Sequence, residues 1–202
     1  MFKTAAILTT ILTIFTYTLK VGKESFPVTY DVTKEADGET MIQMLKEQKS
    51  TFKMDSQHRT TLYKLQSAKD KVDVTIELKD GVYYINGTFK GKAVNKTVKS
   101  EGNPWYQPIG YVLGSVMNGK KSIKYECFNP LDLEFHPMVA KNDGEEVYDG
   151  TRSVKVKINA AGGLASLWHC FYFYDPQTLL QTGYRAVEGG PGTPTTTWTV
   201  AK

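Results

Sequence analysis

The chain has 202 residues, of which 41% are hydrophobic and 23% are charged, and this composition is typical of one globular domain rather than of a disordered chain. Its 25 Lys and Arg residues are spread along the sequence against 21 Asp and Glu residues, so the net charge of +4 does not indicate a nucleic-acid partner. Two Cys and three His residues exclude a disulfide-dense small protein and a four-cysteine zinc module, and they predict neither a metal site nor a cofactor.

Residues 1–19 are typical of a secretory signal peptide or an N-terminal anchor. They read MFKTAAILTTILTIFTYTL, in which one Lys precedes apolar residues diluted only by Thr. The stretch is short and rich in Thr for a membrane-spanning helix, which usually needs about 20 predominantly apolar residues. No small-x-small triplet marks a cleavage point, so cleavage within residues 16–19 and an uncleaved anchor both stay open. We expect a periplasmic or secreted protein with a single β-rich domain over residues 20–202; the alternative is the first strand or helix of a cytosolic domain.

Alternation of apolar and polar residues predicts strands along most of the remaining chain. Residues 72–89 carry this pattern on both sides of Asp80-Gly81, which is typical of a β-hairpin. Residues 164–174 are apolar on both faces, as in a central strand that is covered on each side. Further strands are expected at 26–32, 93–98, 123–127, 154–158, 183–187 and 195–200.

One segment has a helical period. From 107 to 117 the apolar residues recur at helical spacing, with Pro108 near the start and Gly119 just beyond the end, so we expect a helix of about three turns. Residues 40–49 are ambiguous, and their surroundings favour a strand. The fold class is therefore mainly β, with one or two short helices.

The two cysteines lie on separate predicted strands. Cys127 and Cys170 each share a strand face with aromatic residues, so a disulfide between them is plausible in an oxidising compartment. The alternative is two buried free thiols that pack as small hydrophobic groups. A Cys-His nucleophile is disfavoured, because His169 and Cys170 are adjacent and point to opposite faces of a strand.

Motifs for catalysis are missing from the sequence. It contains no G-x-S-x-G nucleophile motif, no phosphate-binding Walker loop and no dinucleotide-binding glycine pattern. The three histidines, His58, His136 and His169, lack metal-ligand spacing. An enzyme site made of His136 and His169 with Asp132 or Glu134 is the weaker alternative.

Aromatic residues provide the best candidates for a binding site. Aromatic rings on a curved antiparallel sheet can line a cavity for an apolar ligand, and phenol or imidazole groups can fix its polar end. The alternative is that these rings form the core. One face of the 164–174 strand is expected to border the cavity, and the candidate ligand-binding residues are Tyr125, Trp168, Tyr172, Tyr174, Trp105 and His136.

Two steps in the second half of the chain carry a resemblance to a known group of proteins. A G-x-x-x-V-K-V step covers residues 150–156, and a W-x-x-x-Y-x-Y-D-P-x-T-x-L step covers residues 168–180. Over about residues 100–187 the sequence resembles uncharacterised exported bacterial proteins with a fold related to the lipoprotein-localisation carriers. The resemblance implies a curved, unclosed antiparallel sheet, a half-barrel or open barrel, whose concave face is covered by a helix and holds an apolar cavity.

These observations favour an exported, non-enzymatic protein that binds a lipid or another apolar small molecule in the cavity of a half-barrel. A structural or interaction protein of the cell envelope, with an envelope protein as partner, is the main alternative. The sequence indicates neither the identity of the ligand nor the oligomeric state.

Overall fold

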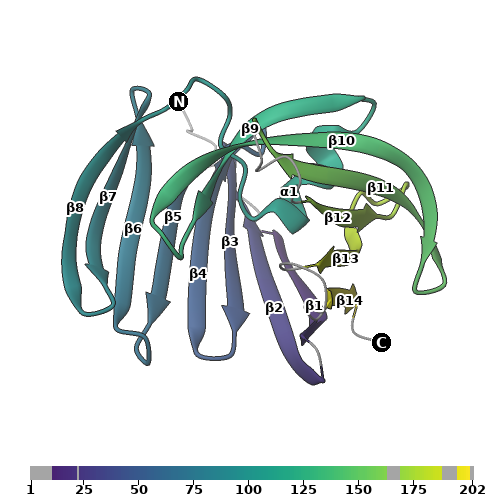
Figure 1. Ribbon diagram of the computed structural model, residues 1–202, viewed down its shortest axis with the longest axis horizontal. Coiled ribbons are helices and arrows are strands. Elements are labelled where there is room, and N and C mark those ends of the chain that lie inside the picture. The colour runs from purple at the N-terminus through teal and green to yellow at the C-terminus, as the bar shows by residue number, and fades with distance from the viewer. Residues whose placement is uncertain (1–10, 22, 163–168, 188–194, 201–202) are drawn as a thin grey trace, which may run out of the picture.

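The computed structural model describes residues 11–21, 23–162, 169–187 and 195–200 (Figure 1). These residues form one antiparallel sheet of 14 strands in the order β8-β7-β6-β5-β4-β3-β2-β1-β14-β13-β12-β11-β10-β9. The helix of this described part, α1, covers Ile109–Met117. The predicted fold class, a mainly β protein built on a curved and unclosed antiparallel sheet, is confirmed.

The first half of the sheet is a meander in which each strand pairs with the next one. Its strands are β1 (Ile11–Val21), β2 (Glu24–Lys34), β3 (Gly38–Leu45), β4 (Gln48–Asp55), β5 (Thr60–Ser67), β6 (Val72–Lys79), β7 (Val82–Phe89) and β8 (Lys92–Lys99). The predicted hairpin over 72–89 is confirmed as β6 and β7. Asp80 and Gly81 have φ values of 50° and 74°, which suit the two-residue turn that joins twisted strands.

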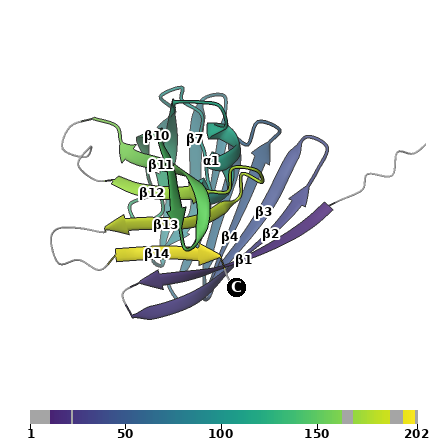
Figure 2. The ribbon, with the colours of Figure 1, turned by 90° about the vertical axis from the view of Figure 1, so that its right-hand side faces the viewer.

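The second half of the sheet folds over the first half. It contains β9 (Ser122–Asn129), β10 (Glu134–Tyr148), β11 (Thr151–Ala160), β12 (His169–Tyr174), β13 (Gln181–Val187) and β14 (Thr195–Val200). Strand β14 pairs with β1, so the first and last strands join the two halves within the sheet. Strands β10 and β11 cross the direction of β3 and β4, and α1 lies between the two halves (Figures 1 and 2).

Aromatic rings pack the two halves against each other. Phe135 of β10 stacks on Tyr83 of β7 with ring centroids 3.5 Å apart, and Trp105 meets both rings edge-on. Phe128 of β9 meets Tyr63 of β5 at 5.9 Å. Both Trp105 and Phe128 are at most 1% exposed, so this cluster is a core that fixes how far the second half folds over the first.

The predicted helix at 107–117 is confirmed as α1. It packs on β12 and the turn after it through Gly114, where an added Cβ would lie 2.0 Å from the carbonyl oxygen of Leu179 and 2.7 Å from Cδ1 of Tyr174. The Tyr174 hydroxyl donates a hydrogen bond to the carbonyl of Ile109 at 3.1 Å. Glycine is therefore the residue that lets the helix approach the sheet this closely.

Strand β1 includes residues 11–19, which belong to the predicted signal peptide or anchor. These residues pair with β2 along the whole strand, and residues 17–21 also pair with β14. Cleavage within residues 16–19 would remove a strand from the junction of the two halves, while the export of the protein stays a prediction. Among the described residues, no helix has the length and apolar character needed to span a membrane.

Candidate functional site

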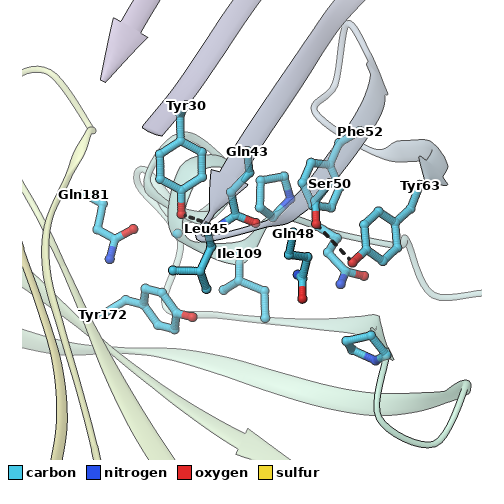
Figure 3. Close-up of a pocket in the computed structure, with 14 residues that line it drawn as sticks. Tyr30, Gln43, Leu45, Gln48, Ser50, Phe52, Tyr63, Ile109, Tyr172 and Gln181 are labelled. Atoms are coloured by element: carbon cyan, nitrogen blue, oxygen red, sulfur yellow. Dashed lines mark hydrogen bonds between the residues drawn. The ribbon is translucent and has the colours of Figure 1, made fainter. Parts of the chain in front are cut away.

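A pocket of about 280 Å³ lies between the concave face of β2–β5 and the start of α1 (Figure 3). Strands β12 and β13 form its far side. The wall is made of apolar side chains, amides and hydroxyls, and its residues are Tyr30, Gln43, Leu45, Gln48, Ser50, Phe52, Tyr63, Gln107, Pro108, Ile109, Gly110, Pro130, Tyr172 and Gln181. None of these side chains is charged.

Hydrogen bonds orient the polar groups on the sheet side of the pocket. Gln43 Nε2 donates to the Tyr30 hydroxyl at 2.9 Å, and Ser50 Oγ lies 3.4 Å from the Tyr63 hydroxyl. Burial raises the pKa of Tyr63 to about 12, and burial raises that of Tyr30 further. Both phenols are therefore protonated at neutral pH and carry hydrogen-bond donors.

On the opposite wall, the Gln181 amide is buried without a partner for its nitrogen. Its side chain is 4% exposed, and Nε2 makes no hydrogen bond within the described part of the chain. Figure 3 shows this amide at the edge of the pocket, facing the tyrosines. Gly110 makes room for it, since an added Cβ there would lie 2.0 Å from Gln181 Oε1.

A buried carboxylate holds the helix in place beside the pocket. Glu39 of β3, 6% exposed, accepts hydrogen bonds from the Tyr111 hydroxyl of α1 at 2.8 Å and from His58 Nδ1 at 2.6 Å. Burial alone would raise the pKa of Glu39, but the hydrogen bonds from His58 and Tyr111 outweigh it and lower the pKa. This group ties α1 to β3 and to the β4–β5 turn without lining the pocket.

Gln107, two residues before the helix, is also fixed by structural hydrogen bonds. Gln107 lines the pocket, yet its Oε1 accepts from Trp105 Nε1 at 3.0 Å and its Nε2 donates to the Phe128 carbonyl at 3.1 Å. The Thr60 hydroxyl donates a hydrogen bond to the Gln107 carbonyl and accepts one from the Gln107 N–H. Gln107 therefore serves to position α1, in contrast to Gln181.

The structure brings one of the predicted ligand-binding residues to this pocket. Tyr172 of β12 lines it, and burial raises the pKa of its phenol well above the usual value. Tyr174, two residues on, borders a separate cavity of about 80 Å³ on the other side of α1. Tyr125 is fully buried, and its hydroxyl has no partner among the described residues.

The remaining candidates lie elsewhere. Trp105 belongs to the aromatic core described above and also borders an open pocket of about 530 Å³, which is lined in part by the charged residues Asp55 and Arg59. His136 is on the surface, with Nε2 at 3.2 Å from Asp132. Trp168 lies outside the described residues.

The alternative enzyme site does not assemble in the described part of the structure. Asp132 pairs with His136 on the surface, while Glu134 pairs with Lys96 of β8 at 2.7 Å. His169 is exposed on β12. No group of three His, Cys, Asp or Glu side chains that could hold a metal ion occurs within these residues.

The predicted disulfide is not formed in the structure, which has Cys127 and Cys170 as free cysteines. Cys127 is on β9 and Cys170 on β12, and β10 and β11 lie between them in the sheet. Burial raises the pKa of each thiol to about 12. Both thiols are therefore protonated and poorly nucleophilic at neutral pH.

Sequence reasoning missed most of the pocket. Its polar wall comes from β2–β5 and β13, in residues such as Tyr30, Gln43, Ser50, Tyr63 and Gln181. One signal was present in the sequence: polar residues occupy inward positions of β4 and β5, where Ser50, Thr60 and Ser67 are all buried. An inward row of hydroxyls in an otherwise alternating strand pattern indicates a polar interior.

Comparisons with protein-family models and with curated proteins found no match. Among solved structures, the chain is similar to a β-barrel-like protein of the domain of unknown function DUF1849 from Brucella abortus. The TM-score is 0.58 and the identity 12%, over 96% of this chain and 97% of that one. A DUF1329 family protein from Desulfovibrio piger matches at a TM-score of 0.30 and 7% identity, over 98% of this chain and 85% of that one. The first likeness supports a β-barrel-like fold and no particular ligand.

Proposed function

We propose that this protein is a non-enzymatic binding protein that holds a lipid or another apolar small molecule in the pocket between β2–β5 and α1. The observation that carries the proposal is the wall of this pocket, where aliphatic and aromatic surface is combined with hydroxyls and amides and with no charged side chain. Small-molecule sites usually have this composition, with apolar walls and a few placed polar groups.

The size of the pocket limits what enters it. A volume of about 280 Å³ equals about nine molecules of liquid water and lies just below the usual range for small-molecule sites. One acyl chain segment or one head group fills such a space, and the rest of a larger lipid would extend through the open side. The protein therefore binds part of its ligand deeply and leaves the remainder accessible.

A periplasmic or secreted location belongs to the same proposal. The apolar N-terminal segment supports it, provided that any cleavage falls before Ile11, where β1 begins. A cut at that position would leave the pairing of β1 with β2 and β14 intact. Fractionation of the native host tests the location, and protein found only in the cytosol would contradict it. N-terminal sequencing tests the cleavage point, and a mature chain that starts inside β1 would contradict the intact pairing of this strand.

The binding function is tested with an uncharged apolar dye, N-phenyl-1-naphthylamine, whose fluorescence rises on leaving water. We expect saturable binding by the wild type and loss of binding in Ile109→Trp, because the larger ring occupies the pocket. Val147→Trp is the matched control, since Val147 lies on β10, is 69% exposed and does not line the pocket. A wild type that does not bind the dye, or an Ile109→Trp variant that binds it unchanged, would refute the proposal.

A further inference from the structure

The unpartnered amide of Gln181 indicates which chemical group the pocket recognises. We propose that Gln181 Nε2 donates a hydrogen bond to the carbonyl oxygen of an uncharged acyl ester or amide, and that the pocket discriminates against the corresponding free carboxylate. This inference rests on the proposed binding function and adds the class of ligand to it.

The first step is the unused hydrogen-bonding capacity of Gln181. A side-chain amide nitrogen carries two N–H donors, and leaving a buried donor unpaired is unfavourable, so such groups in native structures usually have a partner. The Gln181 nitrogen has no hydrogen-bond partner within the described residues, although the side chain is only 4% exposed. Because this nitrogen has almost no exposed surface, the amide must turn toward the pocket to donate to a ligand acceptor there.

The second step is the set of groups facing Gln181. The hydroxyl of Tyr30 accepts its hydrogen bond from Gln43 and so keeps its own proton to donate. Tyr172 stays protonated because burial raises its pKa. The pocket thus offers several donors from both walls, which complement a ligand rich in acceptor oxygens.

The third step concerns charge. No Lys, Arg or His side chain lines the pocket, and α1, with the sequence IGYVLGSVM, contains no charged residue. The start of α1 contributes at most about half of a positive charge from its backbone dipoles, which favours an acceptor oxygen of any kind. A full carboxylate would be buried without a cation to pair with, and such burial is costly. A neutral carbonyl meets the same donors without this cost.

The experiment compares two ligands with the same acyl chain at neutral pH: a monoacylglycerol, which is an uncharged ester, and the free fatty acid, which is ionised. Each is titrated against the bound naphthylamine dye in the wild type. We expect the ester to displace the dye at a concentration at least about tenfold lower than the fatty acid. Because this ratio is measured on the wild type, it does not depend on the folding of any variant.

Gln181→Met then removes the donor while keeping the length of the side chain. We expect its affinity for the ester to fall about three- to tenfold, the usual effect of one neutral hydrogen bond. Gln66→Met is the matched control, because Gln66 lies on β5 outside the pocket. Thermal unfolding of both variants verifies that they are folded.

The outcomes separate the two proposals. If the wild type binds the dye but ester and fatty acid displace it equally well, the inference is overturned while the binding function stays intact. The same holds if Gln181→Met binds the ester as tightly as the wild type does. Preference for the fatty acid would overturn the inference as well. Absence of dye binding in the folded wild type would remove the binding function itself.

Discussion

Replacing either buried glycine of α1 by alanine tests how tightly this helix is packed. Gly110 and Gly114 are one turn apart, and alanine is favoured over glycine within a helix by about 1 kcal/mol. At Gly114 the added Cβ would lie 2.0 Å from the Leu179 carbonyl oxygen. That carbonyl cannot turn aside easily, because hydrogen bonds hold the turn on both sides of it: the Leu179 N–H donates to the Asp175 carbonyl, and the Asp175 N–H donates to the Leu180 carbonyl, each at 2.9 Å. The helix itself must therefore move.

The expected magnitude follows from these two terms. Overpacking of a buried site costs about 1–3 kcal/mol, and the rigid neighbours of Gly114 place the cost near the upper end of this range. The helix propensity of alanine offsets about 1 kcal/mol of it. Gly114→Ala should therefore destabilise the protein by about 2 kcal/mol. For a chain of this size, that is a decrease in Tm of about 4–8 °C. At Gly110 the added Cβ meets the flexible end of Gln181, which can swing away. Gly110→Ala should therefore range from neutral to about 1 kcal/mol more stable.

Urea unfolding followed by intrinsic fluorescence measures both variants against the wild type. The reasoning is refuted if Gly114→Ala is as stable as the wild type, or if Gly110→Ala loses as much stability as Gly114→Ala. Ligand binding gives an independent readout, since Gly110→Ala displaces the Gln181 amide and should weaken ester binding while the protein stays folded.

Further substitutions test the helix tie, the core and the thiols. Tyr111→Phe removes a hydrogen bond to the Glu39 carboxylate and should cost about 1.5 kcal/mol at neutral pH. Because the folded protein lowers the pKa of Glu39, this carboxylate stabilises the fold above its unfolded pKa, and the contribution disappears as the pH falls through the lower folded pKa. If Tyr111→Phe loses as much stability at acidic pH as at neutral pH, the bond from Tyr111 to the Glu39 carboxylate is not the cause. Phe128→Ala empties a buried site between the halves and should cost about 3–5 kcal/mol by urea unfolding, whereas a loss below about 1 kcal/mol would speak against this core. Cys127 and Cys170 should both titrate with a thiol reagent in denaturant without reductant and react slowly in the native protein; no titratable thiol would support the disulfide predicted from the sequence.

Local patterns predicted the elements of the fold well, because they depend on neighbouring residues. The Asp80-Gly81 turn needs two residues with positive φ, and the strands on either side alternate in the usual way. The apolar spacing from 107 to 117 and the Pro108 boundary gave α1 nearly to its ends. The 40–49 segment, which was ambiguous, is divided between β3 and β4.

The site depends on contacts that no local pattern contains. Tyr172 was a candidate because its strand is apolar on both faces, but its neighbours in the pocket come from β2–β5, far away in the sequence. Gln181 stands at the start of a strand and looks like an ordinary surface residue until α1 is placed over it. Trp105 and Tyr125 were chosen as aromatic residues, and the structure places both in the packed interior, where sequence alone cannot separate a core ring from a ligand-contacting one.

The pairing of β1 with β14 has a consequence for how the protein is made. Nearly all other strand neighbours are joined by short connections, so their hairpins can form while the chain is still emerging from the ribosome. Tyr17 meets Val200 only after almost the whole chain has been synthesised. Until then the whole of β1 is an unprotected edge; afterwards β14 covers only residues 17–21 of that edge, and Leu12 and Ile14 stay exposed. Before β14 pairs, a nascent chain is most open to strand exchange with another copy, and a holding chaperone would be of greatest use at that end.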